Sequence, residues 1–170
     1  PLVILQDTLT ITTDNQTVTY GESPEFSSIV TGFVNADSES SVFSGAISYS
    51  LNPNNSNDVG TYAIIPNVLL NTPANYYVNY VNGVLEVLPA TLTITADDKV
   101  INNGNPLPEF TATVTGFRYD DVLASVFSED LMFSIPPVTG PGLYPITPSS
   151  TETPLNYDLI FETGTLYVNP

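Results

Sequence analysis

The sequence predicts an all-β protein made of two tandem, small antiparallel β-sandwich-like domains, each with about seven short strands. Three observations lead to this fold class. The chain matches itself at a shift of roughly 80 residues. Its apolar segments are short, rich in Val, Ile, Thr and Tyr, and alternate with polar residues. Its 15 prolines are scattered along the whole chain, which excludes long helices.

The internal repeat sets the domain boundaries. The motif Leu-Thr-Ile-Thr begins at Leu9 and again at Leu92. Further matched positions follow in the same order: Gly21 and Gly104, Glu25 and Glu109, Gly32 and Gly116, Phe43 and Phe127, Tyr62 and Tyr144, Tyr76 and Tyr157, Leu85 and Leu166. Because this period is longer than a solenoid repeat, each unit is expected to own its core. We expect residues 1–8 to be the tail of a preceding repeat, followed by domains at 9–89 and 90–170 in a fragment of a longer array.

The strand expected from Tyr76 shows the core-facing pattern most clearly. Every second residue is apolar or aromatic in both units: Tyr76, Val78 and Tyr80 in the first, Tyr157, Leu159 and Phe161 in the second. The residues between them do not match in character, as is typical of a half-buried strand. The last strand of each unit repeats the pattern, with Leu85 and Val87 matching Leu166 and Val168.

Turn-forming residues separate these segments. Loops are expected at residues 21–24, 104–108, 52–58 and 136–141, where Gly, Pro and Asn gather. Asn82-Gly83 predicts a hairpin between the last two strands of the first unit.

One segment in each unit is compatible with a helical turn: residues 37–43 and residues 120–127. Val122, Leu123 and Val126 lie at helical spacing after an aspartate that can cap a helix. If this segment were a full helix packed on one sheet, each unit would be β-grasp-like, and that topology remains the alternative.

The charge balance excludes several classes of partner. The chain has 2 Lys and Arg against 18 Asp and Glu, a formal net charge of −16. Binding to nucleic acid or to anionic membrane surfaces requires clustered cations, so neither is expected. Like charge also disfavours self-association, which predicts a monomer. With no Cys, disulfides do not hold the fold, and no apolar run approaches the length of a membrane helix.

The ordered motifs resemble a known family. The first unit reads, in order, Leu-Thr-Ile-Thr, Tyr20-Gly21 before a proline, Thr31-Gly32-Phe33, an acidic segment, Gly60-Thr61-Tyr62, Asn75-Tyr76, and Gly83-Val84-Leu85-Glu86-Val87 ending in Pro89. This order resembles the MBG-type repeats (Tyr-Gly subtype) of large bacterial surface adhesins, over residues 9–89 and 92–170. The second unit departs from it, since Asn103-Gly104 replaces Tyr20-Gly21. The resemblance implies a non-enzymatic stalk module, secreted or at the cell surface, stacked between a cell anchor and a distal binding domain.

Catalytic constellations are mostly missing from the sequence. Without His and Cys, the usual nucleophilic triads and most zinc sites are unavailable. A glycosidase needs only two carboxylates, and Glu25 or Glu109 is conceivable in that role. We interpret them instead as acids at loop edges beside a buried Phe, and we do not expect an enzyme or a cofactor.

Calcium is the sharpest metal hypothesis. The acidic pairs Asp97-Asp98 and Asp120-Asp121 offer carboxylate oxygens of the kind that calcium prefers. The pairs are incompletely repeated, because Asp14-Asn15 and Ala36-Asp37 occupy the matching places. A solvated acidic face is therefore the favoured interpretation.

Exposed aromatic residues are the candidates for direct ligand contact. Tyr77 and Tyr119 stand out because their counterparts in the other unit are not aromatic. The counterpart of Tyr77 is Asp158, and that of Tyr119 is Val34. They support the alternative function, an adhesive module that binds a glycan or a protein directly.

The boundary between the units is the segment that we expect to matter most. Leu85 and Val87 belong to the first core, and Leu92 and Ile94 to the second, which leaves the junction residues Leu88, Pro89, Ala90 and Thr91. So short a connection containing a proline predicts a limited hinge rather than a loose linker.

Overall fold

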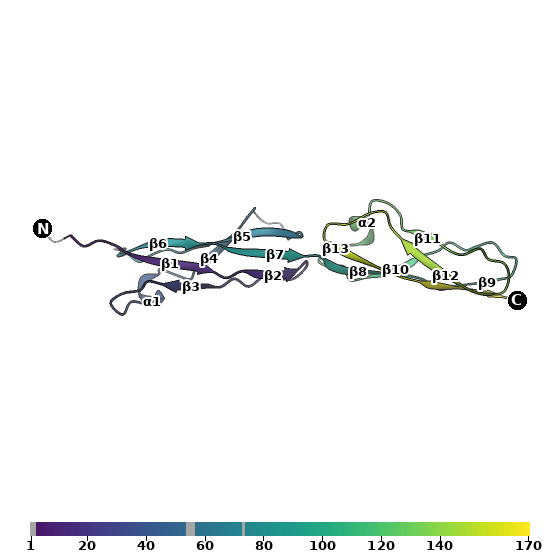
Figure 1. The fold of residues 1–170 in the computed structure, drawn as a ribbon, viewed down its shortest axis with the longest axis horizontal. Coiled ribbons are helices and arrows are strands. Elements are labelled where there is room, and N and C mark those ends of the chain that lie inside the picture. The colour runs from purple at the N-terminus through teal and green to yellow at the C-terminus, as the bar shows by residue number, and fades with distance from the viewer. Residues whose placement is uncertain (1–2, 54–56, 73) are drawn as a thin grey trace. The chain divides into compact units, whose positions relative to one another are not determined.

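The computed structural model describes residues 3–53, 57–72 and 74–170, and it divides into two compact units, Pro1–Leu88 and Pro89–Pro170 (Figure 1). Strands account for 49% of the residues and helices for 5%. The predicted all-β fold of two tandem domains is therefore confirmed.

The first unit contains seven described strands and one helical turn, α1. The strands form two sheets, with the orders β3-β1-β6 and β2-β7-β5-β4. The elements are β1 (Asp7–Thr13), β2 (Gln16–Thr19), β3 (Ser28–Thr31), α1 (Glu39–Val42), β4 (Ser48–Asn52), β5 (Gly60–Asn67), β6 (Tyr76–Val81) and β7 (Gly83–Leu88).

The second unit repeats this design in its described residues. Its sheets have the orders β10-β8-β13 and β11-β12-β14-β9, the same topology as in the first unit. The elements are β8 (Ala90–Ala96), β9 (Lys99–Asn102), β10 (Ala112–Thr115), α2 (Leu123–Val126), β11 (Met132–Ser134), β12 (Gly142–Ser149), β13 (Tyr157–Glu162) and β14 (Gly164–Asn169).

The sheets are mixed rather than purely antiparallel, which corrects one detail of the prediction. β1 pairs in parallel with β6, from Asp7↔Tyr76 to Thr12↔Val81, and β2 pairs in parallel with β7. β1–β3, β4–β5 and β5–β7 are antiparallel. The parallel pairs bring together strands far apart in the chain, since adjacent parallel strands need a long crossover connection.

The hairpin predicted at Asn82-Gly83 is wrong. β6 and β7 are consecutive along the chain, but they belong to different sheets, and Asn82 is the residue at which the chain crosses between them. The glycine is needed there for a different reason. A Cβ on Gly83 would lie 2.5 Å from the carbonyl oxygen of Asp14, where the chain crosses from β1 to β2 in the other sheet.

The core of each unit lies between its two sheets. In the second unit, Ala96 of β8 packs in one buried cluster with Ile146, Leu166 and Val168 of the other sheet. The predicted core positions of the last strand are confirmed: Leu85, Val87, Leu166 and Val168 are at most 5% exposed.

The core face predicted for β6 and β13 holds for only part of each strand. Tyr76 and Tyr157 are buried and Val78 and Leu159 are half-buried. Tyr80 and Phe161, predicted to be core residues, are 40% and 37% exposed. Each is paired with a fully buried residue of the central strand, Ile11 or Ile94, but β6 and β13 are edge strands of their sheets.

The compatible helical segments do form α1 and α2, each a single turn of four residues. Aspartate does not cap them, because Ser38 and Val122 occupy the N-cap positions. Instead, the Oγ of Ser41 accepts a hydrogen bond from the backbone N–H of Ser38. In the second unit, the Oγ of Ser125 accepts one from the backbone N–H of Val122. A single turn beside two sheets favours the sandwich-like fold over the β-grasp alternative. In the described residues no helix is long and apolar enough to cross a membrane.

Candidate functional site

The connection between the units is a single residue, Pro89. β7 ends at Leu88 and β8 begins at Ala90. The Leu88 carbonyl accepts a 2.7 Å hydrogen bond from the N–H of Tyr20, and the Ala90 N–H donates a 3.0 Å bond to the carbonyl of Asn156. Of the four predicted junction residues, Leu88, Ala90 and Thr91 are therefore strand residues, and each of these two hydrogen bonds stays within its own unit.

The same hydrogen bonds recur at the other ends of the units. Asp7, at the start of β1, donates its N–H to the carbonyl of Asn75, as Ala90 does to Asn156. Asn169, near the end of β14, accepts the N–H of Asn103, as Leu88 accepts that of Tyr20. The two units thus begin and end with equivalent backbone contacts.

Tyr76 connects three of the repeated motifs of the first unit. Its ring packs edge-on against Phe33, with 6.3 Å between the ring centroids. Its hydroxyl accepts the N–H of Val34 and donates a 2.7 Å hydrogen bond to the carboxylate of Asp37. In the second unit Tyr157 makes the equivalent contacts with Phe117, the N–H of Arg118 and the carboxylate of Asp121.

The glycine of each Thr-Gly-Phe motif allows two backbone segments to approach closely. Gly32 and Gly116 have φ angles of +102° and +106°, a region that residues with a Cβ rarely adopt. A Cβ at these positions would collide with the carbonyl oxygen of Thr8 or Thr91, respectively. The motif therefore fixes how the loop after β3 or β10 crosses the first strand of its unit.

The Gly-x-Tyr motifs have a similar structural role. The hydroxyl of Tyr62 donates a 2.7 Å hydrogen bond to the carbonyl of Asp58, and Tyr144 bonds the carbonyl of Gly140 at 2.8 Å. Each tyrosine thus closes the loop that precedes its own strand, as the tyrosine corner of other β-sandwiches does. These repeated residues hold the fold.

Three of the four calcium candidates make hydrogen bonds within the fold. Asp97 accepts the hydroxyls of Thr111 at 2.5 Å and Thr113 at 2.8 Å, which together with the nearby Lys99 hold the pKa of its carboxyl below the usual range. Asp98 accepts the N–H of Thr165, and Asp121 accepts the Tyr157 hydroxyl.

The structure does not bring the two acidic pairs together. Asp97 follows the end of β8, whereas Asp120-Asp121 follow Gly116, which lies against Thr91 near the start of β8. Asp120 is exposed. Across residues 3–53, 57–72 and 74–170, no group of three or more acidic side chains is placed to hold a metal ion.

The two candidate ligand-contact tyrosines lie in different units. Tyr77 on β6 is 65% exposed, and Tyr119 is 57% exposed. The assigned counterpart of Tyr119, Val34, is off by one residue. Asn35, with a φ of +53° against +52° for Tyr119, occupies the same left-handed position, to which Asn is well suited. Glu25 and Glu109 are both exposed, each next to a half-buried Phe, and also lie in different units.

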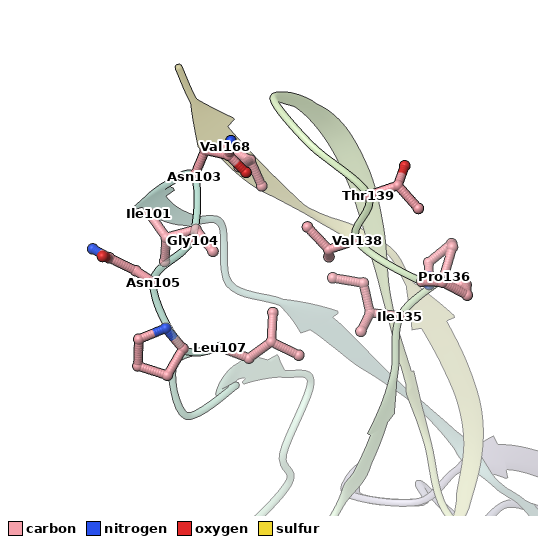
Figure 2. Close-up of a pocket in the computed structure, with 12 residues that line it drawn as sticks. Ile101, Asn103, Gly104, Asn105, Leu107, Ile135, Pro136, Val138, Thr139 and Val168 are labelled. Carbon is pink, nitrogen blue, oxygen red and sulfur yellow. The ribbon is translucent and has the colours of Figure 1, made fainter.

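A cleft of about 630 Å³ lies within the second unit, at residues that the sequence did not predict to form a site. Figure 2 shows the two segments that face each other across it, with Asn103, Asn105 and Leu107 on one side and Val138 and Thr139 on the other. Its one sequence signal is the departure at Asn103, where the first unit has Tyr20.

The repeated motifs agree with a family model. The model of the MBG domain (YGX type) matches residues 9–86 and again residues 92–167. The chain belongs to the MBG (YGX type) family. The tandem MBG repeats recognised in the sequence are therefore confirmed. A comparison with curated proteins finds none that matches.

Membership in the MBG family gives a coarse functional class. MBG repeats are a non-catalytic type of repeat domain and are typical of bacterial surface proteins. The Tyr-Gly pair of this type is present in the first MBG unit and altered to Asn103-Gly104 in the second. The structural roles found above for Gly32, Tyr62 and Tyr76 explain why such motifs recur in both units.

Proposed function

We propose that these two MBG units are structural spacers in the stalk of an extracellular bacterial adhesin and project a distal binding domain from the cell surface. The single-residue connection at Pro89 carries this proposal. Proline fixes its own φ and donates no hydrogen bond, and both neighbouring residues are bonded into strands of their own units. Such a connection leaves few freely rotating bonds, which suits a module whose task is reach and direction.

The strand order within each unit suits a chain under tension. The chain enters the first unit at the start of β1 and leaves it through β6 and β7. Because β1 and β6 run parallel, pulling on the two ends of the unit slides one strand along the other. The six paired positions from Asp7↔Tyr76 to Thr12↔Val81 then resist together rather than opening one after another. β8 and β13 repeat this arrangement in the second unit.

Single-molecule force spectroscopy on the whole chain tests the spacer function. We expect two separate unfolding events, each releasing about 80 residues, or roughly 250 Å of extended chain. Thr10→Pro, on β1 between the partners Thr31 and Asn79, should lower the unfolding force of one event and leave the other unchanged. If both units unfolded at forces no higher than those that open a β-hairpin one bond at a time, a role in carrying tension would be contradicted.

The stiffness of the connection is tested separately. Insertion of Gly-Ser-Gly-Ser after Pro89 adds a flexible linker. Small-angle scattering should show a narrower distribution of overall dimensions for the original chain than for the variant. Equal distributions would mean that Pro89 already acts as a loose linker, and the proposed role in setting direction would be wrong.

An adhesive module is the second candidate function, favoured by the exposure of Tyr77 and Tyr119. Exposed aromatic rings can stack on sugars or insert into a protein partner. A glycan array probed with the original chain and with Tyr77→Ser separates the two functions. A reproducible signal that the substitution removes would support direct adhesion, whereas a spacer gives no such signal.

A further inference from the structure

The cleft in the second unit lies at the end of its core, beside the last strand. Val168 of β14 and Ile101 of β9 are two of its lining residues, and both belong to the hydrophobic cluster of this unit. Ile135 and Val138 line it from the opposite segment (Figure 2). The inner part of the cleft is therefore apolar and continuous with the core.

The first unit has a tyrosine at the backbone position from which Asn103 lines this cleft. Tyr20 and Asn103 each follow the edge strand β2 or β9 directly. Their N–H groups bond the carbonyls of Leu88 and Asn169, which are themselves equivalent. Each is followed by a glycine with a left-handed φ, +92° for Gly21 and +87° for Gly104.

The two side chains differ in what they cover. Tyr20 is 7% exposed and counts among the core residues of the first unit. Asn103 is exposed, and Leu107 beside it is 49% exposed although it is apolar. The second unit thus lacks the aromatic ring that the first unit buries at this position. An aromatic side chain buries about 150–250 Å², so its loss leaves a substantial apolar surface uncovered.

The chemistry of the lining selects the group that fits. The residues that line the cleft are uncharged, all of them within the described part of the chain. Asn103, at the rim of the cleft, supplies hydrogen-bond donors and an acceptor, whereas the side chains of Asn105 and Thr139 point away from it (Figure 2). An apolar interior with a few polar groups is typical of ligand sites, and the volume of about 630 Å³ is in their usual range. A phenol ring matches the apolar part, and the peptide groups on either side of a tyrosine match the amide of Asn103.

The geometry points to a binding site for the tyrosine side chain of another polypeptide segment, in the cleft between Asn103 and Val138. The incoming ring takes the place that Tyr20 fills from within its own unit. This inference goes beyond the spacer function and is independent of it, since a spacer needs no cleft. It assigns a specific role to the one position at which the second unit departs from the Tyr-Gly pattern.

The test is a titration of the whole chain with N-acetyl-tyrosine amide, followed by ¹H–¹⁵N NMR. We expect saturable shifts at the amides of Ile101, Leu107 and Val168, with a dissociation constant of about millimolar order for so small a ligand. The amides around Tyr20 should not move, and they serve as an internal control. p-Cresol, which carries the ring without the peptide groups, should bind more weakly.

Two substitutions at one position make the test specific. Asn103→Tyr should fill the cleft and abolish the saturable shifts, whereas Asn103→Ala should leave the cleft open and retain them. The NMR spectrum of each variant reports directly whether the second unit is folded. Absence of saturable shifts in the original chain, or binding that persists unchanged in Asn103→Tyr, would overturn the proposal. Tighter binding of p-cresol than of the tyrosine amide would overturn the choice of a polypeptide ligand.

Tyr20→Asn provides the reciprocal experiment. It removes the buried ring from the first unit and should create a second set of saturable shifts, at Val18 and Val87. If this variant unfolds the first unit, the result still supports the central premise that the ring is part of that core. A folded variant that binds nothing in the first unit would show that the ring does not define the site.

Discussion

The Tyr76 hydroxyl donates a 2.7 Å hydrogen bond to the carboxylate of Asp37, 39 residues earlier in the chain. The bond fixes the loop after β3 against the first residue of β6. In the second unit Tyr157 and Asp121 form the same pair at 2.6 Å. A hydrogen bond to a charged acceptor is stronger than one between neutral groups, so the pair should contribute to stability in both units.

Tyr76→Phe should therefore weaken the first unit. The substitution keeps the ring that packs on Phe33 but leaves the Asp37 carboxylate and the Val34 N–H without this partner. We expect the midpoint of thermal unfolding of this unit to fall by about 5 °C or more. Calorimetry of the whole chain would measure it. Tyr77→Phe is the matched control, since Tyr77 is 65% exposed, and an equal loss in both variants would contradict this role of the hydroxyl.

Acid should destabilise the second unit partly through Asp97. The hydroxyls of Thr111 and Thr113 and the charge of Lys99 lower the pKa of Asp97 in the folded state. Its stabilising contribution is therefore fully present above the unfolded-state pKa of about 3.9, and it is lost as the pH falls through the lower folded-state value. Denaturant unfolding measured from about pH 6 to about pH 2 covers both pKa values. Over these pH values, Asp97→Asn should lose less stability on acidification than the original chain. Asp120→Asn, which removes one carboxylate at an exposed position, is the matched control.

Gly116→Ala should destabilise the second unit by about 2 kcal/mol or more. The residue has a φ of +106°, and a Cβ there would collide with the carbonyl oxygen of Thr91. Gly140→Ala provides the control, because a Cβ at Gly140 would meet nothing within 4 Å. Urea unfolding of both variants measures the difference. Equal stabilities would show that the close approach at Gly116 relaxes at little cost.

Calcium should leave the stability of the protein unchanged. The oxygens of Asp97, Asp98 and Asp121 already accept hydrogen bonds within the fold. We expect the same unfolding midpoint in calcium and in chelator. A ligand that binds only the folded state stabilises it by RT ln(1 + [L]/Kd) and so raises the midpoint. A rise in calcium that Asp98→Asn removes would therefore identify a site at this pair.

The sequence was most informative where both units repeat the same physical constraint. Period-two alternation located Leu85, Val87, Leu166 and Val168 in the core, and the repeated Gly, Tyr and Phe motifs marked positions that structure requires in both units. The helical turns were found because their spacing differs from that of a strand.

Strand pairing was less accessible because alternation does not specify a partner. β6 and β7 have the same pattern whether they form a hairpin or enter different sheets, so Asn82-Gly83 was mistaken for a turn. The same limit hid the parallel pairing of β1 with β6. Tyr80 and Phe161 were misplaced because alternation does not show that β6 and β13 are edge strands, which are less covered than the central strands β1 and β8.

The cleft could not be predicted from the sequence pattern, because it results from the smaller side-chain volume of Asn103. The replacement of Tyr20 by Asn103 was visible in the sequence as a departure from the Tyr-Gly pattern, but the pattern does not show what the side chain covers. Only the burial of Tyr20 and the exposed Leu107 show what the missing ring leaves uncovered. Departures between repeats of one chain are therefore worth examining as positions where a shared fold acquires an individual surface.

The pairing of β1 with β6 also governs when a unit can fold. Asp7 and Tyr76 lie at opposite ends of the unit's sequence, yet they are partners in one ladder. Contacts between such distant residues give a high contact order, which slows folding. A chain that emerges from its N-terminus can complete the first sheet only after β6 has appeared, and the second only after β7. Each unit should therefore remain unfolded until its whole length is free and then fold as one cooperative step.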